Sequence, residues 1–280
     1  MIANSFDYHR ATSIEDALGK LDAEGSKLIA GGHSLIPLMK LRLSEPAVLI
    51  DIARIPGLSG VREQDGVINI GAGTTHHDVA ASPLLREQCP MLAETADAIG
   101  DPQVRNRGTL GGSLAHADPA ADYPAAMLAL DADIVLQSRR GTRTVKSDAF
   151  FQGMFTVDLA PDELIVSVRI TPTRAAAYAK LHQRASHFAI VGVAAAIRVS
   201  GDTINAARIG LTGAGTHATR LRAVEQALQG KPANRTSVAA AAALASLDEV
   251  NADIHATEEY RRAMIPVFTR RALDGALARL

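Results

Sequence analysis

Two glycine pairs, each flanked by serine or threonine and each leading into an apolar segment, constrain this chain more than any other feature. The first lies in Ala30-Gly31-Gly32-His33-Ser34 and the second in Thr109-Leu110-Gly111-Gly112-Ser113, about 80 residues further on. Glycine reaches positive φ and lets another group approach the backbone closely. Successive N–H groups in such turns form nests that bind anions, and a helix start adds the positive end of its dipole. Both turns are therefore candidates for holding a pyrophosphate, with Ser34 and Thr109 as hydroxyl donors; the alternative is that they are plain turns.

Two further glycine motifs match a dinucleotide-binding turn less well. In Gly71-Ala72-Gly73-Thr74-Thr75-His76, a histidine stands where that fold needs a small residue. The stretch from Gly213 to Ala218 matches G-x-G-x-x-A, but no second parallel strand ending in an acidic residue follows it. The sequence contains no G-x-x-x-x-G-K-[ST] motif. A Rossmann-type NAD site is therefore weakly supported, and a P-loop nucleotide triphosphatase is not supported.

Composition narrows the possible functions. The chain has 280 residues, 47% of them hydrophobic, and a formal net charge of -1, which gives no reason to propose nucleic acid or an anionic membrane as partner. The one cysteine, Cys89, cannot form an internal disulfide or hold an iron–sulfur cluster alone, so any cluster would lie on another chain. There is no apolar run of about 18 residues, and residues 1–12 lack the apolar core of a secretory signal. We therefore expect no membrane span and a cytoplasmic location.

Hydrophobic periodicity predicts an α+β chain whose character changes near residue 174. A capping-box pattern at Thr12 and Glu15 predicts a helix over 13–24. The first glycine pair then lies in a βαβ-like unit, with strands over 27–30 and 47–52 around a helical segment over 35–43. Later elements are strands at 67–72 and 163–170, helices at 75–81, 90–99 and 124–130, and a hairpin of 134–137 with 143–146. Residues 101–122 have no clear period, which indicates a long functional loop or a buried irregular segment.

The C-terminal part has the pattern of a small antiparallel sheet with helices. Strands are predicted over 178–183, 190–199 and 203–211, with Ser200-Gly201-Asp202 turning the last pair. Helices are predicted over 218–229 and 237–246, and a last helix begins after Thr257.

One polar cluster lies after the second glycine pair. His116, Asp118 and Asp122 form an H-x-D-x-x-x-D pattern that could bind a divalent metal. We favour the alternative that these are loop residues whose carboxylates cap backbone N–H groups or contact a sugar. A second histidine close to His116 in the sequence, which would strengthen the metal hypothesis, is absent.

Taken together, these motifs resemble those of the FAD-binding medium subunits of the molybdenum hydroxylases, the group of xanthine dehydrogenase and carbon monoxide dehydrogenase. The resemblance covers residues 1–280 and rests mainly on the two glycine motifs and their separation. Its residues are Ala30-Gly31-Gly32-His33-Ser34-Leu35-Ile36-Pro37 with Lys40 and Arg42, Asp101-Pro102-Gln103-Val104-Arg105, Gly108-Thr109-Leu110-Gly111-Gly112-Ser113, Asp118-Pro119, Asp122, Phe6-Asp7-Tyr8 and Tyr260-Arg261.

The resemblance implies an α+β fold of the vanillyl-alcohol-oxidase (PCMH) type. Two α+β subdomains, residues 1–54 and 55–173, would clasp FAD between them. Residues 174–280 would form a C-terminal domain of the carbon monoxide dehydrogenase flavoprotein type, with a three-stranded antiparallel sheet and helices.

It also implies which residues contact the cofactor. The two glycine motifs would bind the FAD pyrophosphate through backbone N–H groups, and Asp122 would contact the cofactor as well. The expected cofactor-binding residues are Ala30, Gly31, Gly32, His33, Ser34, Leu35, Thr109, Leu110, Gly111, Gly112, Ser113, Asp122, Ile165 and Phe188. No catalytic acid or base and no metal ligand is expected from this chain.

One segment departs from the family pattern. Near the flavin ring, members of the family carry a tyrosine or lysine within the segment written here as Ser186-His187-Phe188-Ala189-Ile190. Phe188 offers neither a hydroxyl nor an ammonium group, although it can shield one face of a flavin. The departure puts in doubt a hydrogen-bonding role at that position and a likeness to the NAD-reducing branch.

The implied function is that of an electron-transfer subunit. A large molybdenum-cofactor subunit would oxidise the substrate, and a small subunit with [2Fe-2S] clusters would pass electrons to the FAD held here. Quinone, oxygen or NAD would accept them, and the three subunits would form a heterotrimer that pairs into a dimer. Carbon monoxide dehydrogenase is the nearest expectation. Two other hypotheses remain: a non-catalytic partner-binding module, and a stand-alone metal enzyme using His116, Asp118 and Asp122.

Overall fold

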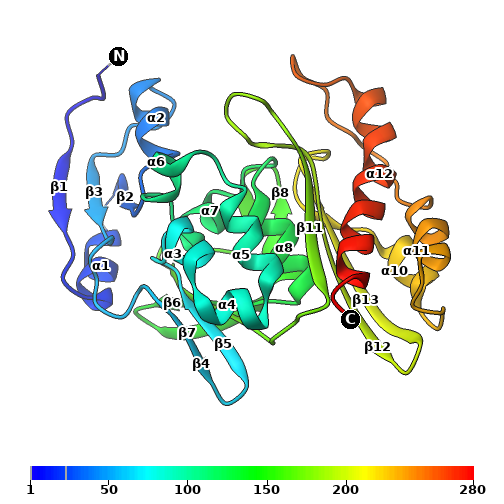
Figure 1. Cartoon of the computed structure of the whole chain (residues 1–280). Helices are drawn as coiled ribbons and strands as arrows, with labels where there is room; N and C mark the ends of the chain where they lie inside the picture. The colour runs from blue at the N-terminus through cyan, green and yellow to red at the C-terminus, as the bar shows by residue number, and fades with distance from the viewer. Residues whose placement is uncertain (1, 23) are drawn as a thin grey trace.

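Three large sheets follow one another along the chain in the computed structural model, which describes residues 2–22 and 24–280 (Figure 1). The first is a parallel sheet of order β1-β3-β2, with β1 at Asp7–Arg10, β2 at Ser26–Ile29 and β3 at Val48–Asp51. Helix α1 (Ile14–Leu21) lies between β1 and β2 in the chain, and α2 (Leu35–Lys40) between β2 and β3. The predicted strand–turn–helix–strand unit around the first glycine pair is thus confirmed.

The start of α1 differs from the prediction by one residue. Ser13, not Thr12, is the N-cap, because its hydroxyl accepts the N–H of Asp16 at 3.1 Å. The backbone N–H of Thr12 in turn donates to the Asp16 carboxylate at 3.0 Å. The structure therefore has a variant of the capping box, in which Ser13 caps Asp16 and Asp16 accepts the N–H of the residue before the N-cap.

The second sheet is antiparallel throughout, with order β4-β5-β10-β6-β7. Its strands are β4 (Val61–Gln64), β5 (Val67–Gly71), β6 (Asp133–Ser138), β7 (Gly141–Lys146) and β10 (Leu164–Ile170). The hairpin β6–β7 and the strands β5 and β10 confirm the predictions, whereas β4 was not expected. Helices accompany this sheet at α3 (His76–Ala81), α4 (Pro83–Gln88), α5 (Pro90–Asp97), α8 (Asp122–Leu130) and α9 (Ser147–Phe150), with a small hairpin of β8 (Phe151–Gly153) and β9 (Thr156–Val157).

The prediction of a loop over residues 101–122 was wrong for much of that segment. It contains α6 (Pro102–Arg105) and α7 (Leu110–His116). Each begins at a side-chain cap: the Asp101 carboxylate accepts the N–H of Val104, and the Thr109 hydroxyl accepts that of Gly112. Short helices that start at caps and contain glycines show little hydrophobic period, which explains why the pattern did not reveal them.

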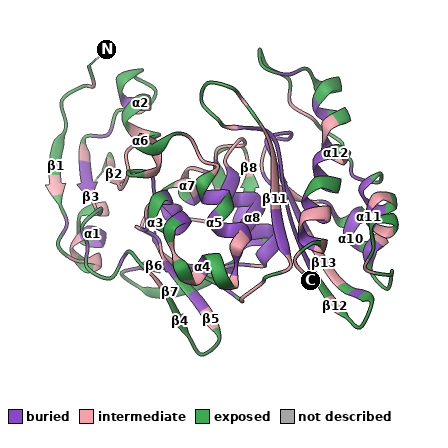
Figure 2. Ribbon diagram, viewed as in Figure 1, coloured by how far each residue is buried: buried purple, intermediate pink, exposed green. Residues whose placement is uncertain are grey.

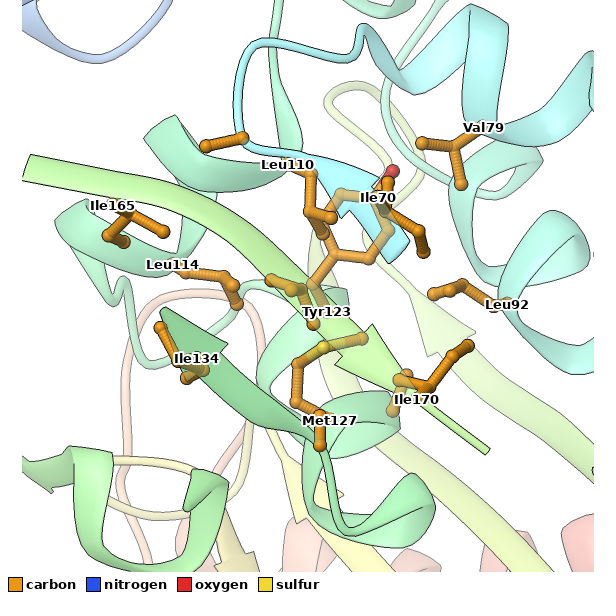
Figure 3. Close-up of a cluster of buried hydrophobic side chains, with 14 of the residues drawn as sticks. Ile70, Val79, Leu92, Leu110, Leu114, Tyr123, Met127, Ile134, Ile165 and Ile170 are labelled. Atoms are coloured by element: carbon orange, nitrogen blue, oxygen red, sulfur yellow. The ribbon is translucent and has the colours of Figure 1, made fainter. Parts of the chain in front are cut away.

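Helix α8 is buried along its whole length, from Asp122 to Leu130 (Figure 2). It packs on one side within the core of the second unit and on the other against strands of the C-terminal sheet. Figure 3 shows Tyr123 and Met127 of this helix among Leu110, Leu114 and other side chains of that core. A helix that is apolar all round belongs inside a protein, so α8 joins the second and third units. Cys89, between α4 and α5, is also fully buried in this core.

The third sheet has four antiparallel strands, not the three predicted. Its order is β11 (Ala176–His182), β12 (Ala189–Ser200), β13 (Thr203–Thr212) and β14 (Thr219–Arg220). The extra strand arises because Thr219 and Arg220 pair with the end of β13, and α10 (Arg222–Leu228) starts only after them. Two further helices, α11 (Arg235–Ala242) and α12 (Glu258–Leu277), complete the unit, and Thr257 caps α12 as the sequence indicated. Across the described ranges, no helix combines the length and apolar character that crossing a membrane requires.

Candidate functional site

A cavity of about 1110 Å³ lies where the three units meet. This volume is slightly above the range of about 300–1,000 Å³ that small-molecule pockets occupy. Each unit contributes to its wall: residues 26–35 of the first, most residues of the segments 108–122 and 159–165 of the second, and residues 186–188, 213, 251, 253 and 261 of the third.

The two glycine turns touch each other in this cavity. A Cβ atom on Gly31 would lie 2.3 Å from the carbonyl oxygen of Arg107 and 2.7 Å from Cα of Gly108. Only a residue without a side chain permits this approach. The turns that lie about 80 residues apart in the sequence therefore form one surface.

The first turn presents free backbone donors. Gly32 has a φ of +75°, which turns the chain in the left-handed region where glycine is favoured. Within residues 2–22 and 24–280, no backbone or side-chain acceptor takes the N–H groups of residues 31–35. All five of these residues line the cavity. They form a nest of donors next to the start of α2 that suits a doubly charged group such as a pyrophosphate.

The second turn has used its donors within the chain. The N–H groups of Leu110 and Gly111 donate to the carbonyls of Thr74 and Ala72, at 3.0 and 2.8 Å. Those of Gly112 and Ser113 donate to the hydroxyl and carbonyl of Thr109, at 3.1 and 3.0 Å. The Thr109 hydroxyl, predicted as a ligand donor, is thus the cap of α7.

The second turn packs on the stretch Gly71-Ala72-Gly73-Thr74-Thr75, which sequence analysis treated as a weak nucleotide-binding motif. Besides accepting two N–H groups of the second turn, this stretch leads into His76, whose N–H donates to the carbonyl of Gly108 at 2.9 Å. A Cβ on Gly111 would lie 2.5 Å from the Cβ of Ala72. The glycines here allow the two turns to pack closely. In the sequence, the same glycines were interpreted only as a weak match to a dinucleotide-binding motif.

Nearly all predicted cofactor-binding residues line the cavity. Ala30 to Leu35, Thr109, Gly111, Gly112, Ser113, Asp122, Ile165 and Phe188 all do so. Leu110 differs, because its side chain is fully buried in the core (Figure 3). Its position follows from the helix: it is the first residue of α7, and its side chain packs inward.

Asp122 is the most deeply buried carboxylate of the cavity wall, with 4% of the residue exposed. Its Oδ1 accepts the hydroxyl of Tyr178 at 2.5 Å and lies 2.9 Å from Nζ of Lys180. Burial raises the pKa of Asp122, and these two partners oppose that rise. Desolvation likewise raises the pKa of Tyr178 well above its ordinary value, so its hydroxyl remains a donor.

The H-x-D-x-x-x-D pattern does not assemble into a metal site. Nε2 of His116 and Oδ2 of Asp118 lie 4.0 Å apart, but Asp122 faces Tyr178 and Lys180. In the ranges 2–22 and 24–280, no three histidine, cysteine or carboxylate side chains are grouped to hold a metal ion. Asp118 instead accepts the N–H of Ala120 at 2.8 Å, the capping role that the sequence favoured.

Comparison with known proteins identifies the family of this chain. Residues 4–174 match the FAD binding domain in molybdopterin dehydrogenase, and residues 176–276 match the CO dehydrogenase flavoprotein C-terminal domain. The chain belongs to this family. It is an FAD-binding medium subunit of the molybdopterin dehydrogenases, a flavoprotein subunit of the carbon monoxide dehydrogenase-like type.

Several relatives match this medium subunit over its whole length. The carbon monoxide dehydrogenase medium chain of Hydrogenophaga pseudoflava is 41% identical over 100% of this chain and 99% of its own. The solved carbon monoxide dehydrogenase of that organism superposes with a TM-score of 0.95 at 42% identity, covering 100% and 99% of the two chains. The nicotine 6-hydroxylase medium subunit of Paenarthrobacter nicotinovorans is 38% identical over 97% of each chain. Quinoline 2-oxidoreductase of Pseudomonas putida 86 superposes with a TM-score of 0.93 at 31% identity, covering 99% of each chain.

The residues present fit FAD. The free donors at residues 31–35 suit its pyrophosphate, and these residues line the cavity. The close contact of Gly31 with Arg107 and Gly108 leaves no space for a ligand between those segments. The medium subunit's cavity also extends from β2 to α12, which provides room for groups on both sides of a pyrophosphate.

Of the wall supplied by the C-terminal unit, sequence reasoning named Phe188 and missed the role of Arg261. Arg261 of α12 is 2% exposed, and its NH1 donates to the carbonyls of Ile190 and Gly213 at 2.7 and 2.8 Å. Its NH2 pairs with Asp253 at 2.6 Å. The available signal was a charged residue on the buried stripe of the last helix, between Met264 and the Thr257 cap.

Proposed function

We propose that this medium subunit holds FAD with its pyrophosphate on the first glycine turn and carries electrons from a partner's [2Fe-2S] clusters to an external acceptor. The observation that carries the proposal is the nest of free N–H donors at residues 31–35 inside the cavity. FAD, when bound, supplies the redox chemistry, since it exchanges electrons with one-electron and two-electron partners. The chain's own residues bind and orient the cofactor and shield it from water.

The finer fold assignment belongs to the same proposal. We infer a vanillyl-alcohol-oxidase (PCMH)-type arrangement in which residues 1–54 and 55–173 form two FAD-binding subdomains and residues 174–280 a flavoprotein domain. The three sheets at 7–51, 61–170 and 176–220 support this division. Two of the predicted contacts, Ile165 on β10 and Phe188 before β12, line the cavity from different units. This separation supports a cofactor that extends across the cavity and contacts both units.

The partners follow from the family. We propose a small iron–sulfur subunit and a large molybdopterin subunit, assembled as a heterotrimer that pairs into a dimer in the cytoplasm. Relatives of similar identity are named for carbon monoxide and for nicotine, which supports a substrate choice made by the large subunit. Carbon monoxide is the first substrate to test, and quinone, oxygen and NAD are the acceptors to compare.

The test uses the complex isolated through a tag on this chain. Its flavin is removed and then restored, and substrate-dependent reduction of a dye acceptor is measured beside the visible spectrum. We expect the flavin band and acceptor reduction to return together on adding FAD, while cluster reduction by substrate persists without FAD. Equal acceptor reduction with and without FAD would refute the electron-transfer role. A complex that never takes up FAD would favour the partner-binding module instead.

A further inference from the structure

A buried polar cluster joins the FAD-binding part to the C-terminal unit at the cavity wall. Asp122 begins α8, and its two partners Tyr178 and Lys180 stand on β11 of the C-terminal sheet. The side chains of Asp122 and Lys180 are 5% and 7% exposed. Buried charges are costly unless paired, and a buried charged pair at a cavity wall is a candidate for a functional role.

The geometry of the cluster is asymmetric. Tyr178 and Lys180 both reach Oδ1 of Asp122, and no other side chain in the described ranges donates to Oδ2. Lys180 is itself held by the carbonyl of Ala98, to which its Nζ donates at 2.7 Å. Tyr178 fits because Gly192 on the neighbouring strand β12, which pairs with Lys180, lacks a side chain: a Cβ there would lie 2.3 Å from the tyrosine hydroxyl. One carboxylate oxygen is therefore fixed and the other is left available as an acceptor.

The backbone around Asp122 is fixed by the same unit. Oγ1 of Thr212 lies 3.0 and 2.7 Å from the carbonyl oxygens of Pro119 and Ala121, and its one proton is shared between these two acceptors. The N–H of Gly213 also donates to Pro119, and that of Ala189 to Ala120. Asp122 thus has little freedom to turn away from the cavity that it lines.

We propose that Lys180 and Tyr178 are positioning residues that hold Asp122 ionised and aimed, so that its second oxygen accepts a hydroxyl group of the bound FAD. This inference rests on the proposed function, because it requires FAD in the cavity. A carboxylate only accepts hydrogen bonds, and the ribityl chain and the ribose of FAD both carry hydroxyl donors. Tyr178 and Lys180 do not line the cavity themselves, so they act through Asp122.

The groups that face Asp122 explain why Lys180 is needed. They are Lys180 and Tyr178 from β11 and Tyr123 from its own helix. Burial raises the pKa of Asp122, and the ammonium of Lys180 is the largest influence that lowers it. Without that ammonium, the pKa of Asp122 rises further, and FAD binding should then strengthen as pH rises and the carboxylate ionises.

The test measures FAD affinity by flavin fluorescence in the flavin-stripped complex, over a range of pH. We expect Lys180→Met to weaken binding roughly 10- to 100-fold at neutral pH, the range for one charge-assisted hydrogen bond, and to give affinity that rises with pH. Lys180→Arg should restore most of the affinity, and Lys180→Met with Asp122→Asn should bind weakly at every pH. Lys146→Met is the matched control, since Lys146 is an exposed ion-pairing lysine that does not line the cavity. Competition by ADP and by riboflavin then tells which half of FAD carries the hydroxyl.

The outcomes distinguish failure of the positioning role of Lys180 from failure of FAD binding itself. If the wild-type complex binds FAD while Lys180→Met binds it with wild-type affinity, or with a loss that is the same at every pH, this inference is overturned alone. If Lys180→Met fails to fold, Tyr178→Phe tests the same cluster. We expect Tyr178→Phe to weaken FAD binding by up to about 10-fold. A wild-type complex that binds no FAD overturns the proposed function and this inference with it.

Discussion

Replacing Gly31 with alanine tests whether the first glycine turn supplies the donors for the cofactor. The new Cβ would lie 2.3 Å from the Arg107 carbonyl oxygen, whereas ordinary contact begins at 3.4 Å, so the turns must separate by about 1.1 Å. Overpacking of this kind costs about 1–3 kcal/mol of stability. A shift of that size also misaligns at least one N–H donor, and one charge-assisted bond contributes about 1.5–3 kcal/mol. We therefore expect FAD affinity to fall at least about 10-fold.

Gly111→Ala is the comparison variant that separates the loss of N–H donors from the effect of overpacking. Its Cβ would meet Ala72 at 2.5 Å, a similar clash, but the N–H of Gly111 already donates to Ala72 and is not available to a ligand. We expect a similar loss of melting temperature and a smaller loss of FAD affinity. Gly19→Ala, with nothing within 4 Å of the new Cβ, is the control and should stabilise α1 by about 0.5–1 kcal/mol.

The assay is a fluorescence titration of the flavin-stripped complex with FAD, beside thermal melts of each variant. If Gly111→Ala lost the cofactor while Gly31→Ala kept it, the assignment of donors to the first turn would be wrong. The second turn would then have to release its internal hydrogen bonds on binding.

Three further outcomes follow from buried polar groups. Burial lowers the pKa of His76 to about 4, so stability should fall by up to about 3 kcal/mol as pH drops from 6.5 toward 4, because the unfolded chain takes up the proton first. His76→Gln should flatten this slope in melts across that pH range, whereas the same change at exposed His77 should not. Arg261→Met leaves two backbone carbonyls without their donor and should cost about 1–3 kcal/mol for each; an unchanged melting temperature would contradict this. Thr109→Ala removes the cap of α7 and should cost about 1 kcal/mol in denaturant unfolding, with far less effect if the hydroxyl served a ligand instead.

The sequence predicted the elements with strong period and the glycine turns, and it failed where local chemistry sets the structure. The hairpin at 133–146 and the long strands of the C-terminal sheet were visible because each contains a short apolar run and the paired runs are separated by turn residues. Strand β14 has only two residues, and α6 and α7 begin at caps, so none of them leaves a period to detect.

The sequence predicted which residues lie at the site but not which of their N–H groups are free to bind a ligand. Glycine, serine and threonine made each turn a candidate for binding an anion, and the family resemblance implied one shared pyrophosphate; both turns do line one cavity. Which N–H groups are free depends on the partners that the fold brings to them, such as the carbonyls of Ala72 and Thr74. The roles of Lys180 and Arg261 depend on distant segments meeting, which a single sequence does not encode locally.

The burial of Cys89 makes this chain convenient for site-specific labelling. Burial raises the pKa of its thiol to about 12, and the side chain is fully enclosed, so maleimide reagents should leave it untouched. A cysteine introduced at any exposed position would then be the chain's one reactive thiol. Spin or fluorescent probes placed in this way would report the distance from this subunit to the iron–sulfur clusters that we propose for its partner, without first removing a native residue.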